Sequence, residues 1–148
     1  MRLLPRFTFS LLLLAGLATA GHAQELVSAR TQGANLRSAA STQAEVQWQL
    51  ARGYPLQVLQ REGGWLKVQD FEGDQGWVAA SVTQLAPHHV VRVRSANLRQ
   101  GPGTEFPVVG YAVYGQVLAT EHRGEAWVRV RSRDGQSAWV ARDLLWGW

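Results

Sequence analysis

Apolar and polar residues alternate one by one in several short runs of this 148-residue chain. Clear examples begin at Leu66 and Val128, where every second residue of the run is apolar. A period of two is typical of strands with one buried face, whereas an amphipathic helix has a period near 3.6. Glycine-containing turns separate the runs, at positions 62–64, 72–74, 101–103, 123–125 and 134–135. The pattern predicts an all-β fold without an amphipathic helix, and with Val82 or Leu144 in a single 3₁₀ turn.

The first 23 residues follow a different pattern. Two arginines precede an almost wholly apolar stretch, residues 7–20, which ends in small residues. This is the layout of a secretory signal peptide, with cleavage after Ala20 or Ala23. The stretch is shorter than the roughly 20 residues that a membrane helix needs. We therefore expect a periplasmic or secreted protein with no membrane span after signal cleavage, and an uncleaved anchor is the alternative.

The rest of the chain is a tandem repeat of one unit. The sequence ANLR at Ala34–Arg37 recurs at Ala96–Arg99, a shift of 62 positions, and later tryptophan, glycine and apolar positions keep this shift without a gap. A repeat of that length predicts two small complete domains, at residues 25–86 and 87–148. The joint near Pro87 is short, so the two domains are expected to lie close together.

The second unit opens with Asn97–Phe106, the sequence NLRQGPGTEF, and closes with a Trp-Val pair. This pattern resembles the bacterial SH3 (SH3b) domain. The first unit keeps Asn35–Arg37 but has Ser38–Ser41 where the second has its Gly-Pro-Gly turn. The resemblance implies a small SH3-like β-barrel of five or six strands in each unit. It also implies a non-catalytic module of the cell envelope, a class in which many members bind peptidoglycan or its peptides.

The resemblance further implies that ligands contact the loops after the Asn-Leu-Arg motif, residues 38–46 and 100–108, together with neighbouring aromatic residues. Charge points to the second unit, because residues 25–86 carry five basic and six acidic side chains whereas residues 87–148 carry eight and five. One run of the second unit has an aromatic or basic residue at every second position: Trp127, Arg129, Arg131 and Arg133. Such residues share one face of a regular strand. Arginine on that face suits carboxylates, and the alternative is a solvated face that serves solubility.

The candidate ligand contacts combine this face with the motif arginines and the paired tryptophans: Trp127, Arg129, Arg131, Arg99, Trp139, Trp65 and Arg37. The alternative for each tryptophan is a structural role in a small barrel. The expected partner is peptidoglycan or another acidic envelope polymer, contacted more strongly and with salt sensitivity by the second unit. The alternative function is an adaptor that binds a peptide or an envelope protein. No nucleic-acid partner is expected for an exported protein.

The sequence offers no convincing catalytic or metal site. It contains no cysteine, which excludes disulfides and thiolate nucleophiles. His88 and His89 stand at the joint without further ligands at useful spacing, so we interpret them as a solvated linker. Asp70, Glu72 and Asp74 surround one turn and are interpreted as a solvated hairpin tip. We therefore expect no enzymatic activity, no cofactor and no bound metal.

Overall fold

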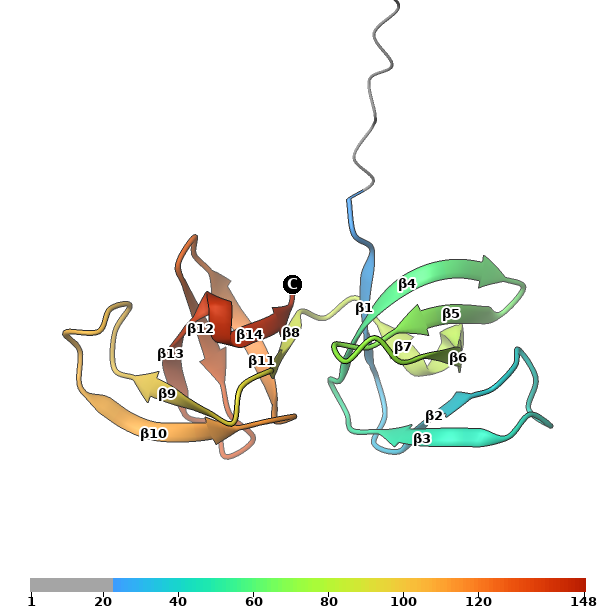
Figure 1. Ribbon diagram of the computed structural model, residues 1–148, viewed down its shortest axis with the longest axis horizontal. Coiled ribbons are helices and arrows are strands. Elements are labelled where there is room, and N and C mark those ends of the chain that lie inside the picture. The colour runs from blue at the N-terminus through green and yellow to red at the C-terminus, as the bar shows by residue number, and fades with distance from the viewer. Residues whose placement is uncertain (1–22) are drawn as a thin grey trace, which may run out of the picture.

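The computed structural model describes residues 23–148, and in this range it shows β-strands and two 3₁₀ helices. The predicted signal peptide, Met1–Ala23, lies outside the described residues except for Ala23 itself. The strands form two separate antiparallel sheets of seven strands each, connected by residues 85–87 (Figure 1). The prediction of an all-β fold is confirmed. Within residues 23–148, no helix is long and apolar enough to cross a membrane.

The first sheet has the strand order β3-β2-β6-β5-β4-β1-β7. Its elements are β1 (Leu26–Ala29), β2 (Ala34–Arg37), β3 (Val46–Leu50), β4 (Pro55–Glu62), β5 (Trp65–Gln69), β6 (Gln75–Ala79), the 3₁₀ helix η1 (Ala80–Val82) and β7 (Thr83–Gln84). Because the helix η1 ends at Val82, it stands at a position where the sequence predicted a 3₁₀ turn.

The second sheet has the equivalent order β10-β9-β13-β12-β11-β8-β14. Its elements are β8 (His88–Val91), β9 (Ser95–Arg99), β10 (Val108–Val113), β11 (Val117–Arg123), β12 (Trp127–Arg131), β13 (Ser137–Ala141), the 3₁₀ helix η2 (Arg142–Leu144) and β14 (Leu145–Gly147). The strands β12 and β13 and the helix η2 match β5, β6 and η1 at the shift of 62 positions. The sequence repeat is therefore a repeat of the fold.

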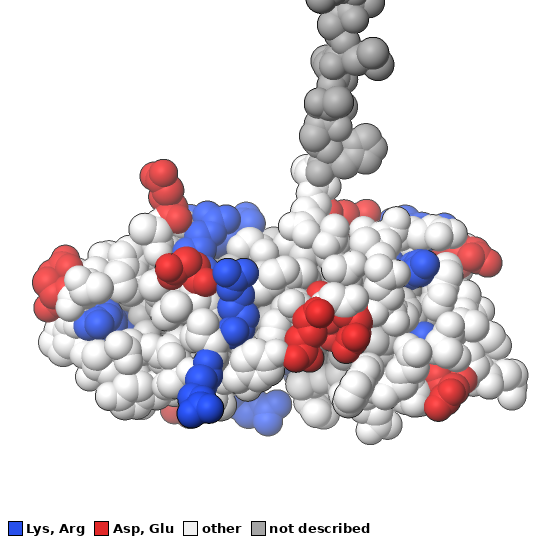
Figure 2. Space-filling view, viewed as in Figure 1, with Lys and Arg blue, Asp and Glu red and all other residues white. Residues whose placement is uncertain are grey.

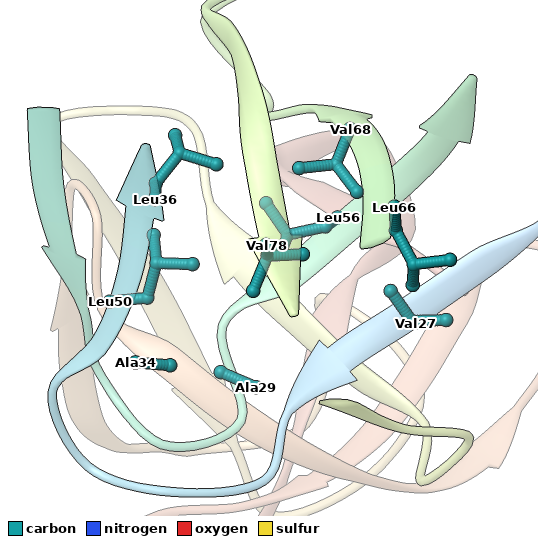
Figure 3. Packing of buried hydrophobic residues seen from close by; sticks show 9 residues of the cluster. All are labelled: Val27, Ala29, Ala34, Leu36, Leu50, Leu56, Leu66, Val68 and Val78. Carbon is teal, nitrogen blue, oxygen red and sulfur yellow. The ribbon is translucent and has the colours of Figure 1, made fainter. Parts of the chain in front are cut away.

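Each sheet wraps around its own apolar core. In β5, Leu66 and Val68 are buried while Trp65, Lys67 and Gln69 are half-buried on the other face, as the period of two predicts. Figure 3 shows the first core: Val27, Ala29, Ala34, Leu36, Leu50, Leu56, Leu66, Val68 and Val78. The second core is built in the same way: Val91, Ala96, Ala112, Leu118, Val128, Val130, Val140 and Leu145. Burial of each Leu or Val contributes roughly 1.5–3 kcal/mol, which matters in domains of this size.

The histidines at the joint are part of the second domain. β8 lies between β11 and β14, and it buries His89 so that only 2% of the residue is exposed. Nδ1 of His89 lies 2.7 Å from Oγ1 of Thr120. The interpretation of these residues as a solvated linker is therefore wrong for His89. Burial lowers the pKa of His89 to about 4.

The two domains contact each other beside the joint. The carbonyl oxygen of Ala86 accepts hydrogen bonds from Oγ of Ser28 at 2.8 Å and from Nδ1 of His88 at 2.9 Å. The rings of Phe71 and Tyr114 pack edge to face, with their centroids 5.3 Å apart. The connecting segment is thus bonded to both domains, and one aromatic contact joins the domains directly.

Candidate functional site

The candidate residues of the second domain meet on the outer face of its sheet. In the antiparallel register, Arg129 of β12 lies opposite Trp139 of β13, and Trp139 lies opposite Arg99 of β9. Trp127 and Arg131 lie on either side of Arg129 along β12, and the residues between them are buried in the core. The structure therefore brings together all five candidates of this domain.

The first domain repeats this arrangement. Lys67 of β5 lies opposite Trp77 of β6, and Trp77 lies opposite Arg37 of β2. Trp65 begins the same strand as Lys67. We name the two sets Arg129–Trp139–Arg99 and Lys67–Trp77–Arg37 the cation–Trp–cation rows. Trp65 and Arg37 were predicted as ligand contacts, whereas Lys67 and Trp77 were not, although the shift of 62 positions identifies these two as counterparts of Arg129 and Trp139.

The four paired tryptophans lie outside the cores. Trp65, Trp77, Trp127 and Trp139 are all half-buried on the outer face of their sheets. Trp139 is further covered by His122, whose ring packs edge to face at 6.0 Å between centroids. The tryptophans therefore support the sheet with part of their surface and present the rest to solvent.

Glu121 neutralises part of the basic face of the second domain. One carboxylate oxygen lies 2.6 Å from Nε of Arg131, the other lies 3.2 Å from Nε of Arg129, and Oγ of Ser137 donates at 3.0 Å. The hydrogen bonds from Arg131 and Ser137 lower the pKa of Glu121. A β-bulge in β11 brings Glu121 beside β12. Glu121 was not predicted as part of this face, because its counterpart is the uncharged Leu59.

The motif arginines hold the loops that follow them. Nη1 of Arg37 donates to two carbonyl oxygens of the 38–46 loop, at 3.1 and 2.9 Å. Nη1 of Arg99 donates to the equivalent carbonyl oxygens of the 100–108 loop at the same two distances. Each guanidinium therefore fixes its loop with one nitrogen and leaves other N–H groups for the outer face.

Arg133 lies apart from the strand face on which the sequence pattern placed it. The strand β12 ends at Arg131, and the backbone N–H of Ser132 donates to the carbonyl of Gln136 at 2.9 Å to close the turn. Alternation along the strand stops there, so Arg133 lies in the turn, where it lines a cleft between the two domains.

Three carboxylates of the first domain lie within 4.8 Å of one another, those of Asp70, Glu72 and Asp74. Only 8% of Asp70 is exposed, and its Oδ1 accepts backbone N–H groups of Glu72 and Asp74 at 2.9 Å each. Burial raises the pKa of Asp70. The solvated-tip interpretation is correct for Glu72 and Asp74 and wrong for Asp70, which closes the turn. In Figure 2, acidic side chains gather on the first domain beside the junction, whereas basic side chains lie on the facing part of the second.

Comparison with known proteins identifies the family. Residues 30–84 match one family model described as a bacterial SH3 domain, and residues 94–145 match a second model with the same description. The chain belongs to the bacterial SH3 domain family, with two such domains in tandem. The resemblance found in the sequence motif is therefore confirmed, and with it the SH3-like fold of each unit.

Relatives of the SH3 tandem include much longer proteins. The chain is 23% identical over 150 residues to the Bacillus subtilis (strain 168) protein named "Putative N-acetylmuramoyl-L-alanine amidase YrvJ", covering 94% of this chain and 28% of that protein. Among solved structures, NlpC2 from Trichomonas vaginalis is 18% identical, with a TM-score of 0.36 over 84% of this chain and 48% of that one. An NlpC/P60 family protein from Bacillus cereus ATCC 10987 is 16% identical, with a TM-score of 0.39 over 84% and 56%. The chain thus spans less than a third of the B. subtilis protein.

Proposed function

We propose that this protein is an exported, non-catalytic binding module that recognises peptidoglycan through its two SH3 domains. The observation that carries the proposal is the cation–Trp–cation row, which recurs at equivalent register in both domains. The exposed part of each tryptophan offers a flat apolar surface for a sugar ring or an apolar side chain. Cations on either side of it suit the carboxylates of cell-wall peptides.

The B. subtilis relative supports this choice of ligand. Its name describes an amidase of the N-acetylmuramoyl-L-alanine bond, and this chain aligns with 28% of its length. From this relative we infer a location at the cell wall for the present protein, and we do not infer amidase activity. Export is part of the same proposal, and its support is the signal-like pattern of the first 23 residues.

Sedimentation with purified peptidoglycan sacculi tests this function. We expect the mature protein to enter the pellet, and the Trp77→Ala/Trp139→Ala variant to lose most of this retention. The variant Lys67→Gln/Arg129→Gln tests the same rows without removing a packed ring. Trp48→Ala is the matched control, because Trp48 is 60% exposed on β3 and belongs to neither row. Mature protein that remains in the supernatant contradicts the proposal, and release of soluble muropeptides would indicate a hydrolase.

One feature of the second domain favours a protein partner as the second candidate. β10 is an edge strand without charged residues, and its outward residues Val109, Tyr111 and Val113 are 54%, 67% and 57% exposed. At the equivalent positions, the first domain has two glutamines and an alanine. An uncharged edge strand can accept a strand from a peptide or an envelope protein. Copurification of one envelope protein, abolished by Tyr111→Lys while sacculi are not bound, would establish this adaptor function.

A further inference from the structure

Two positions of the repeat face each other across the junction in both combinations: the first position of one domain faces the second position of the other, and the reverse. Phe71 of the first domain packs against Tyr114 of the second. At the shift of 62 positions, the counterpart of Phe71 is Arg133 and the counterpart of Tyr114 is Arg52. Arg52 and Arg133 lie together at the junction, lining one cleft from opposite domains. Equivalent positions that face each other twice with the domains exchanged are the arrangement of a two-fold interface, in contact on one side and across a cleft on the other.

The two sides of this junction have opposite character. On one side, two aromatic rings are in direct contact, and the hydroxyl of Tyr114 donates to the carboxylate of Glu72. On the other side, the two arginines line an open cleft of about 520 Å³. The duplication has therefore produced one closed side and one open side from the same pair of positions.

The open cleft is lined by positive charge. Besides Arg52 and Arg133, its lining includes Arg131 and the imidazole of His88, and it includes no aspartate or glutamate. Arg131 is paired with Glu121, whereas Arg52 and Arg133 form no ion pair within residues 23–148. Guanidinium groups gathered in a cleft repel one another and concentrate anions, and an oxyanion accepts their N–H groups in pairs.

The walls of the cleft are held in place before any ligand arrives. The turn of the first domain approaches the His88 ring so closely that a Cβ atom on Gly53 would lie 2.5 Å from its Cδ2. The same ring donates through Nδ1 to the carbonyl of Ala86, which also accepts a hydrogen bond from Ser28 of the first domain. A ligand therefore does not have to order the domains when it binds.

We propose that this cleft between the domains binds carboxylate groups of an acidic peptide segment through Arg52 and Arg133. The volume of about 520 Å³ accommodates a segment of a few residues, which is larger than a single small anion. The proposal rests on the function proposed above in one respect, because it names the chemical group of the cell-wall peptide that the tandem recognises. It assigns this contact to residues of both domains, whereas the cation–Trp–cation rows each lie within one domain.

The test uses two soluble probes, tetraglutamate and its neutral counterpart tetraglutamine, titrated against the mature protein and followed by calorimetry or NMR. We expect tetraglutamate to bind at low ionic strength and to be weakened by salt, and tetraglutamine not to bind. The variant Arg52→Gln/Arg133→Gln should lower the affinity at least about tenfold, since two charge-assisted contacts are lost. The variant Arg52→Tyr/Arg133→Phe copies the aromatic side of the junction and should abolish binding.

The matched control is Arg61→Gln/Arg123→Gln. These residues are repeat counterparts near the far ends of β4 and β11, and neither lines the cleft. Their substitution removes the same charge from each domain as the Arg52→Gln/Arg133→Gln variant does. The control should bind tetraglutamate like the original protein. Equal affinity in the Arg52→Gln/Arg133→Gln variant, or equal binding of the two probes, overturns the cleft proposal. Failure of the protein to sediment with sacculi overturns the peptidoglycan function instead, so the two failures are distinguished.

Discussion

The two domains bury equivalent positions but present different outward surfaces. Leu56 and Leu118 occupy equivalent positions, and both are fully buried. The turns after β5 and β12 also share a backbone hydrogen bond, from Asp70 to Asp74 at 3.0 Å and from Ser132 to Gln136 at 2.9 Å. The side chains on these two turns nevertheless differ: the first carries Phe71 with three carboxylates, whereas the second carries Arg133 with one, that of Asp134. The core and the turn hydrogen bonds therefore determine the barrel. Surface positions are free to differ, and in this protein they form a junction on one side and a cleft on the other.

Most core positions that differ exchange one apolar residue for another, but one position pairs an apolar residue with a titratable one. Val27 and His89 are counterparts, and both are buried, with 3% and 2% exposed. The first domain therefore has an apolar side chain where the second has a titratable one. This single difference gives the second domain a sensitivity to acid that the first domain lacks at this position.

The largest effect is expected from truncating the equivalent core leucines. Leu56→Ala and Leu118→Ala each leave a cavity in a fully buried site and should cost about 2–5 kcal/mol of unfolding free energy. We expect each variant to destabilise its own domain, because the two cores are separate clusters. Denaturant unfolding followed by tryptophan fluorescence should then resolve two transitions. A single transition that moves equally in both variants would show instead that the domains unfold as one unit.

The second effect is the acid sensitivity of the second domain. Burial lowers the pKa of His89 from 6.5 to about 4, so the folded state binds fewer protons than the unfolded state between these values. The resulting stability is complete above pH 6.5 and is lost as the pH falls toward 4, by about 3 kcal/mol in total. Thermal unfolding across this range measures the loss. The His89→Val variant, which copies Val27, should remove most of this slope, and an unchanged slope would assign it to other groups.

The sequence was sufficient to predict the architecture because runs such as Leu66–Val68 and Val128–Val130 follow a period of two and glycine-containing turns separate several of the strands. The burial of His89 also had a signal, since its counterpart Val27 belongs to an apolar run. No sequence signal revealed the environment of Arg129 and Arg131. The bulge that brings Glu121 beside them interrupts the period of two on which the prediction depends.

The junction was also beyond the reach of sequence reasoning. The shift of 62 positions relates each residue of the first domain to its counterpart in the second, and it carries no information about which residues touch across the joint. Phe71 and Tyr114, for example, belong to unrelated positions of the repeat and meet only in the folded tandem. The cleft lined by Arg52 and Arg133 follows from the same geometry and not from any motif.

A smaller effect should distinguish the two motif loops. Each motif arginine donates two hydrogen bonds to its loop, and replacement by glutamine should cost about 1–2 kcal/mol. The 100–108 loop has a second support, because the Phe106 ring packs directly on the backbone of Gly101. A Cβ atom on Gly101 would lie only 2.4 Å from Cδ1 of that ring. We therefore expect Arg37→Gln to raise amide hydrogen exchange in its loop more than Arg99→Gln does. Equal exchange in the two variants would mean that the Phe106 contact does not hold its loop.

The smallest effect concerns the closed side of the junction. The Tyr114 hydroxyl donates to Glu72 of the other domain, and this hydrogen bond raises the pKa of Tyr114. Tyr114→Phe removes the hydroxyl and keeps the ring that packs on Phe71. Because the pair is exposed to solvent, we expect little change in either melting transition and a measurable increase in the relative motion of the domains. Residual dipolar couplings of both domains report this motion, and Tyr114→Ala, which also removes the ring, should increase it further. Unchanged couplings in both variants would show that the segment around Ala86, held by Ser28 and His88, fixes the junction without the aromatic contact.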